Sequence, residues 1–378
     1  MNALFALALI LGIIPGPAPQ KTTTGVATAP QVEKLTQDRK AEEAMDKGRA
    51  AVAAHPDDVD LRLALARAIA AKARRLKRVL NVNMSKEDIA RGEVQLKGVD
   101  LGAATPQVDY DAGLFDEAIL HLEYGIKRAP QREDLRVFYC FLLTDAGHID
   151  RAKAAITSTL AALPKTPALA KTMTAYGAER AKRGDSEGGA ALLAPVASAF
   201  PTDAAILVDY ANVLTRLGRK SEAYAAFDRV TELAPREVRY ARTNAVGAML
   251  LRDYRRAQAA FDAAFRLGHG VGDQFASYAA AYGIDPKGSA ALMRELGAPA
   301  ASSDPSVADL ANSFARAGTA GPASREAMTL ARSLLASQQF VLAIPVLDRA
   351  IRARPKDAEA KTMLQTTFRE LGCASLAK

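Results

Sequence analysis

The chain has 378 residues, of which 49% are hydrophobic and 24% charged, with a formal net charge of +8 and 6% aromatic residues. Ample apolar material and a small charge imbalance exclude an intrinsically disordered chain, and abundant alanine favours closely packed helices over a β-sandwich. A basic surface attracts polyanions, so the charge allows nucleic acid, anionic lipid, acidic glycan or acidic protein as a partner.

The N-terminal residues predict export. Ala3 to Ile14 is a run of twelve apolar residues without charge, which is too short to span a bilayer but matches the core of a signal peptide. No basic residue precedes this run, so an apolar tail of another kind is the alternative. We expect a signal peptide over residues 1–19 and a periplasmic or secreted protein, which argues against nucleic acid as the partner.

Helical periodicity begins near Asp38. Residues 20–37 are polar and Thr-rich, and we interpret them as a flexible leader. Residues 38–79 then predict two N-terminal helices, one over 39–54 and a longer one over 58–79. The second carries five cations and no acid at its end, namely Lys72, Arg74, Arg75, Lys77 and Arg78. This basic arm would dock on a partner or on an anionic membrane surface; the alternative is that the arm and the insert after it are a tolerated, mobile insertion.

Residues 80–111 keep no repeat pattern and are interpreted as an insert. Ser85 with Asp88 predicts the start of a short helix, and alternating apolar residues between Val94 and Leu101 indicate a small hairpin. A long irregular stretch in a compact array is either functional or a tolerated insertion. We favour a docking role.

From 112 to 269 the sequence repeats with a period of about 34 residues. Prolines stand at 130, 164, 201 and 235, and His269 continues this nearly even series. Twelve positions before each stands a very small residue, and four positions after that a large apolar one. The small residues are Ala118, Ala152, Gly189, Ala223 and Ala257, and the large ones are Leu122, Ile156, Leu193, Phe227 and Phe261. Glycines at 113, 147, 184 and 218 precede the small residues by five positions.

Each position of this pattern has a physical role. The glycine ends a first helix, the small residue lets a second helix approach it closely, and the proline ends the second helix. This order resembles the tetratricopeptide repeat family. In residues 204–235, Leu207, Tyr210, Ala211 and Leu214 occupy the family's W, L, G and Y positions, and Ala223, Phe227 and Pro235 its A, F and P positions. The resemblance implies an all-α solenoid, a right-handed superhelix of helix pairs.

The C-terminal third is less regular. In residues 270–321, Pro286 comes early, so we predict a degenerate repeat with a short second helix over 287–296, a loop over 297–305 and a helix over 307–317. The repeat returns in 322–372, with Ala343, Leu347 and Pro355 in frame. A last helix over 357–371, ending at Gly372, would cap the array with a polar face.

The family resemblance implies that the first helix of each pair lines a concave groove that binds a peptide or protein. Candidate groove residues are Asp209, Asn212, Arg216, Arg239, Arg242, Thr243, Asp273 and Ser277. From 236 to 256 six arginines face two acids, which indicates either a basic groove or a set of solvated helix charges. A clamp for a terminal carboxylate is not supported, because Val208 stands where the family places a lysine.

Little in the sequence indicates catalysis. The four histidines, His55, His121, His148 and His269, lie in different units and are best explained as surface or turn residues. Cys140 and Cys373 lie far apart in the chain, and we expect both to be unpaired, with Cys140 in the core. We predict no enzyme activity, no cofactor and no metal. An enzyme hidden in 270–321 is the least favoured of three functions, after an envelope interaction scaffold and an accessory protein for an anionic envelope polysaccharide.

Overall fold

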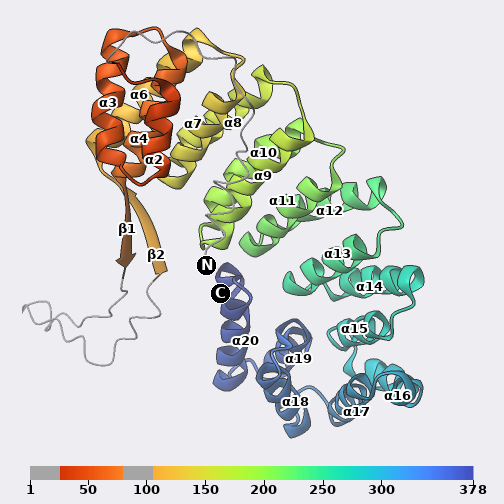
Figure 1. Cartoon of the computed structure of the whole chain (residues 1–378). Coiled ribbons are helices and arrows are strands. Elements are labelled where there is room, and N and C mark those ends of the chain that lie inside the picture. The colour runs from red at the N-terminus through yellow and green to blue at the C-terminus, as the bar shows by residue number, and fades with distance from the viewer. Residues whose placement is uncertain (1–25, 80–104, 378) are drawn as a thin grey trace, which may run out of the picture. The chain divides into compact units, whose positions relative to one another are not determined.

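Helices make up most of the described chain (Figure 1), which comprises residues 26–79 and 105–377 of a computed structural model. It divides into unit 1, Met1–Leu135, and unit 2, Arg136–Lys378. The predicted signal peptide and the elements predicted between Ser85 and Leu101 lie outside the described residues. Among the helices that are described, none is long and apolar enough to cross a membrane.

The described residues of unit 1 form helices and a strand pair. The helices are α2 (Ala29–Gln37), α3 (Ala41–Ala54), α4 (Val59–Ala73) and α6 (Ala112–Arg128). The prediction of a flexible leader over 20–37 is wrong in its second half, because α2 packs on α3 and α4 and buries Val32 completely. The backbone N–H of Thr28 donates to the Gln31 side chain at 2.9 Å, so a local cap starts this short helix.

The helix predicted over 58–79 ends at Ala73. Beyond it, strand β1 (Arg74–Val79) pairs antiparallel with β2 (Thr105–Tyr110), with Arg74 opposite Tyr110 and Val79 opposite Thr105. The backbone N–H of Asp111 also donates to the carbonyl of Ala73 at 3.0 Å. The strand partner comes from the far end of the insert, so the helical pattern before Ala73 could not reveal it. Along the chain, the strand pair thus lies between the paired helices α4 and α6.

Unit 2 is a succession of helices, most of which pack on their neighbours along the chain. They are α7 (Glu133–Asp145, which begins in unit 1), α8 (Ile149–Ala162), α9 (Pro167–Lys182), α10 (Ser186–Ala199), α11 (Ala204–Leu217), α12 (Lys220–Leu233), α13 (Val238–Leu250), α14 (Tyr254–Gly268), α15 (Val271–Tyr282), α16 (Pro286–Ser303), α17 (Pro305–Ala320), α18 (Arg325–Ala336), α19 (Phe340–Ala353), α20 (Ala358–Glu370) and the 3₁₀ helix η2 (Ala374–Ala377).

The roles assigned to the repeat positions are confirmed in most units. Gly147, Gly184 and Gly218 follow first helices with φ of 83°, 93° and 73°, a region that favours glycine. Gly113 is the exception, because it lies in the first turn of α6. At Gly189 a Cβ atom would come within 2.8 Å of the Gly177 carbonyl oxygen, so only a glycine permits this approach of α9 and α10.

The region 270–321 is more regular than predicted. Helix α16 runs from Pro286 to Ser303, so both the short helix over 287–296 and the loop over 297–305 are wrong. Asp304 caps the next helix, accepting from the backbone N–H of Ser306 at 3.1 Å. A Cβ at Gly318 would collide with the carbonyl of Pro286, so α17 packs closely on α16.

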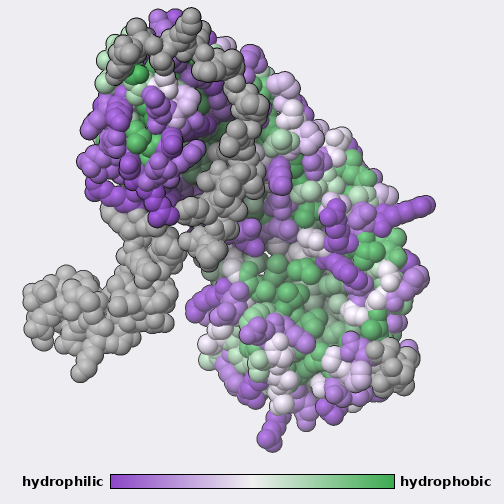
Figure 2. Space-filling view, in the orientation of Figure 1, coloured by the Kyte–Doolittle hydropathy of each residue, from purple (hydrophilic) through white to green (hydrophobic). Residues whose placement is uncertain are grey.

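The last elements of unit 2 return to its earlier helices. Helix α19 packs on α13 and α15, and η2 packs on α11 (Figure 1). One hydrophobic core cluster accordingly extends from α13 through α20, and Figure 2 shows green, hydrophobic surface where these helices of unit 2 meet. The sequence predicted a capping helix and a concave groove lined by the first helix of each pair. In unit 2, however, part of the wall formed by α11, α13 and α15 is covered by the chain's own C-terminal elements.

Candidate interaction surface

Among the predicted groove residues, those on α11 and α13 are at least partly accessible to solvent. Asp209, Arg239 and Arg242 are exposed, and Asn212, Arg216 and Thr243 are half-buried. We call this face, together with that of α9, the inner wall. Packing around the Asp209 carboxyl raises its pKa by desolvation, and the charge of Lys182 opposes that shift.

Two predicted groove residues are buried in α15. Asp273 is 6% exposed and binds Arg242 with two hydrogen bonds of 2.7 Å each. These bonds raise the pKa of Arg242. Ser277 is completely buried, and its hydroxyl donates to Asp262 at 2.5 Å. The expectation that these two side chains face an open groove is therefore corrected, because both are already bonded inside the unit.

The arginines of 236–256 do not form a bare basic patch. Arg256 bonds to Asp228 at 2.6 Å and lies 4.1 Å from the Tyr224 ring centroid. Arg239 donates to the Tyr240 hydroxyl at 2.8 Å, yet 71% of its side chain is exposed. Pairing weakens the attraction of Arg256 for a polyanion, whereas Arg239 keeps a largely exposed charge.

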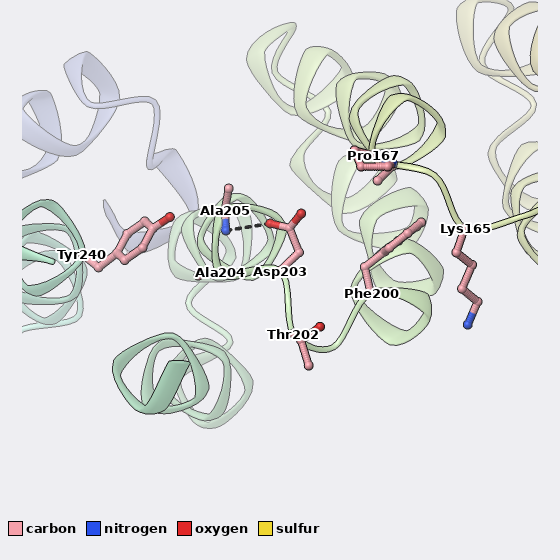
Figure 3. Close-up of a pocket in the computed structure, with 9 residues that line it drawn as sticks. Lys165, Pro167, Phe200, Thr202, Asp203, Ala204, Ala205 and Tyr240 are labelled. Carbon is pink, nitrogen blue, oxygen red and sulfur yellow. Dashed lines mark hydrogen bonds between the residues drawn. The ribbon is translucent and has the colours of Figure 1, made fainter. Parts of the chain in front are cut away.

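An open cleft of about 400 Å³ lies at the N-terminal ends of α9, α11 and α13 (Figure 3). We call it the α9–α13 cleft. Its lining consists of Lys165, Pro167, Ala170, Phe200, Thr202, Asp203, Ala204, Ala205 and Tyr240. Pro167, Phe200 and Tyr240 supply apolar surface, and Lys165 with Thr202 supplies polar groups. In Figure 3 Tyr240 extends from α13 toward α11.

Helix starts position the cleft residues. Asp203 precedes α11 and accepts from the backbone N–H groups of Ala205 and Ile206 at 3.0 and 3.2 Å. Thr166 caps α9 in the same way, accepting from Leu169 at 3.1 Å, and places Pro167 at the first helical position. Sequence reasoning missed this cleft. The signal available was the junction between consecutive repeats, where a polar helix cap follows a closing proline or aromatic residue.

The predicted basic arm is divided between a helix end and a strand. Lys72 lies 3.4 Å from Glu42, and Arg75 lies 3.1 Å from Asp111, so acids of unit 1 pair with two of the five cations. Arg74 faces Tyr110 across the strand pair, and Lys77 and Arg78 follow in β1. The predicted helix over 74–79 is therefore wrong, because these residues form a strand, whereas the docking role of the five cations stays a prediction.

The histidines and cysteines lie apart from the cleft. His121 is half-buried, a correction to its predicted surface position, and its Nδ1 lies 3.1 Å from an Arg62 nitrogen. Both cysteines are unpaired and Cys140 is buried, as predicted, and Cys373 is buried as well. Burial raises the pKa of Cys140 to about 12. Over the described residues, no three His, Cys, Asp or Glu side chains gather where a metal could bind.

Residues 109–176 and 181–245 match the family model for the tetratricopeptide repeat. No curated protein matches the sequence. Solved structures that align include MamA of MSR-1, with 23% identity over 42% of this chain and 89% of that chain and a TM-score of 0.27. A MamA of AMB-1 has 24% identity over 42% and 85%, with a TM-score of 0.28. PilF of Pseudomonas aeruginosa has 11% identity over 64% and 90%, with a TM-score of 0.30.

Proposed function

The chain is a tetratricopeptide-repeat protein, and from this premise we propose that it is a non-catalytic scaffold holding a peptide or protein along its inner wall. The observation that carries the proposal is the α9–α13 cleft. Three successive inner helices open there into one hollow with aromatic and proline surfaces and a polar rim. Such a surface suits an extended polypeptide, whose side chains fill apolar hollows while its backbone meets polar groups.

Arg239 is the charged side chain best placed to steer a partner toward this cleft. It is largely exposed and sits beside the cleft residue Tyr240, with its guanidinium 4.5 Å from that ring's centroid. Exposed rim charges act mainly on the association rate and on salt dependence. An acidic segment next to an apolar residue is therefore the partner chemistry that the wall favours.

Site-specific photocrosslinking in intact cells tests the proposal. A photoreactive amino acid at Thr202 or at Arg239 should yield the same crosslinked partner, identified by mass spectrometry. The same amino acid at Lys153, an exposed residue of the outer helix α8, is the control and should not yield it. Identical adducts from all three positions would contradict an inner-wall site.

Charge reversal supplies a second test. Arg239→Glu should weaken capture of that partner, whereas Arg255→Glu, at an exposed position on α14, should leave capture unchanged. Arg242 is unsuitable for this purpose, since a glutamate there would face the buried Asp273 and destabilise the fold.

The cell envelope is the proposed location of this scaffold. The apolar run Ala3–Ile14 supports export. A fusion of residues 1–37 to alkaline phosphatase, which is active only after export, should give active enzyme. Replacing Leu7 and Leu11 in that fusion with arginine should abolish the activity.

A further inference from the structure

The C-terminal tail, residues 374–377, occupies the end of the inner wall opposite the α9–α13 cleft. The Ser375 hydroxyl donates to the carbonyl oxygen of Arg216 in α11. The Arg252 guanidinium, just after α13, donates to the carbonyl oxygen of Leu376 at 2.8 Å. Leu376 also lies against Gly218, where it reaches within 3.0 Å of the position that a Cβ atom would take.

Each of these three contacts recognises a general feature of a polypeptide. The Arg216 carbonyl belongs to the last turn of α11, where helix carbonyls lack an intrahelical partner and readily accept a hydroxyl proton. Gly218 has no side chain, so its left-handed turn leaves space for a leucine. Arg252 binds a main-chain carbonyl, which every peptide carries.

Residues of α19 and α20 hold the arginine of this site in place. Arg252 lies 3.8 Å from the buried carboxylate of Asp348 in α19, and 5.2 Å from the ring centroid of Phe368 in α20. These contacts do not involve the tail, so its departure would leave the guanidinium oriented toward the same space.

We propose that this end of the inner wall is a peptide-binding site that the chain's own tail fills, and that a partner peptide displaces it. The partner presents the chemistry of the tail: a hydroxyl residue followed by leucine among small residues, as in Ala374-Ser375-Leu376-Ala377. The inference rests on the proposed function, since it adds to the same wall a second peptide site, which the chain's own tail fills.

The tail is suited to exchange because it is short and partly exposed. It forms a four-residue 3₁₀ helix in which Ala374 and Ser375 are exposed and Leu376 is half-buried. Segments with few buried contacts open locally at much lower cost than the whole fold. Cys373 directly precedes the tail and is 1% exposed, so its thiol reports on tail release.

A labelled peptide with the sequence of residues 368–378, carrying serine in place of Cys373, tests the proposal on the full chain. Wild-type protein should bind it weakly, because a tethered tail acts at an effective concentration in the millimolar range. Leu376→Glu in the protein should release the tail and strengthen binding by at least about tenfold. Adding Arg252→Ala should reverse that gain, while adding Arg255→Ala should not. Equal binding by wild type and Leu376→Glu, or by the variants with and without Arg252, would overturn the proposal.

Thiol labelling of the wild-type chain gives a second measurement that needs no variant. Added peptide should raise the rate at which Ellman's reagent modifies Cys373, and the rise should saturate. Cys140, also buried, is the internal control and should stay slow. If circular dichroism shows that Leu376→Glu does not fold, the modification rate of Cys373 in the wild-type chain is the deciding measurement. An unchanged rate would then refute the proposal. Because the probe is the chain's own tail, such a failure leaves photocrosslinking at Thr202 as an independent test of the scaffold.

Discussion

Replacing Asp348 with alanine should destabilise unit 2 by about 2–4 kcal/mol, mainly because it leaves the buried hydroxyl of Tyr254 without an acceptor. Asp348 is 4% exposed, and the Tyr254 hydroxyl donates to it at 2.9 Å. Burial raises the pKa of Tyr254, so this hydroxyl stays protonated and remains a donor. A hydrogen bond to a charged group contributes about 1.5–3 kcal/mol, and a buried unsatisfied hydroxyl costs about 1–3 kcal/mol.

The arginines around Asp348 add less to this figure. Arg352 lies 2.9 Å and Arg252 3.8 Å from the carboxylate, but their side chains are 56% and 33% exposed. When the carboxylate is removed, water can therefore solvate both guanidinium groups and replace much of the lost interaction. Asp348→Asn keeps an acceptor for Tyr254, so it should cost only about 1–2 kcal/mol.

A double-mutant cycle in urea isolates the Tyr254–Asp348 bond. Tyr254→Phe alone should cost about 1–2 kcal/mol, and the double variant should be more stable than the sum of the two losses predicts, by at least about 1 kcal/mol. Asp309→Ala, at an exposed position of α17, is the matched control and should change stability by less than about 0.5 kcal/mol. Additive losses, or an Asp348→Ala effect no larger than the control, would refute the reasoning.

Three further substitutions test other parts of the fold. Gly189→Ala should cost about 1–3 kcal/mol in urea unfolding, because its methyl group would press on the Gly177 carbonyl. Phe227→Ala should cost about 3–5 kcal/mol by the same measurement, since the ring is completely buried. His121 should make unit 1 less stable in acid. Desolvation, followed by the charge of Arg62, lowers its pKa from the ordinary 6.5, so the unfolded chain takes up the proton first. Stability should be complete above pH 6.5 and fall as the pH drops through the folded-state pKa, and His121→Gln should flatten this dependence of the urea midpoint.

Contrary results would be informative in each case. A Gly189→Ala protein as stable as wild type would mean that α9 and α10 can move apart without loss. A small effect of Phe227→Ala would mean that the cavity collapses. Equal acid sensitivity in wild type and His121→Gln would assign the pH dependence to other groups.

The regular repeats could be predicted because their signals are local. Glycines such as Gly184 and Gly218 end helices through their own backbone conformation, and Pro235 follows the end of α12, which it prevents from continuing. Both effects act within one turn of the residue, so the regular spacing of these residues maps directly onto helix pairs.

The remaining features depend on distant partners. Helix α2 is polar in composition and forms because Val32 finds a site on neighbouring helices. Strand β1 needs a partner from the far end of the insert. The cleft brings Lys165, Phe200 and Tyr240 together from three junctions. The burial of Ser277 follows from contacts across helices, which a single helix pattern does not record.

The return of the C-terminal elements changes how unit 2 is expected to unfold. In an open solenoid each repeat touches only its neighbours, so its ends can fray while the middle stays folded. Here hydrogen bonds join Tyr254 to Asp348 across 94 residues, Arg252 to Leu376 across 124, and Ser375 to Arg216 across 159. Loosening the last helix therefore removes support from α11 and α13, so unfolding becomes more cooperative. The same long-range contacts slow folding, because residues far apart in the chain must meet before these bonds can form.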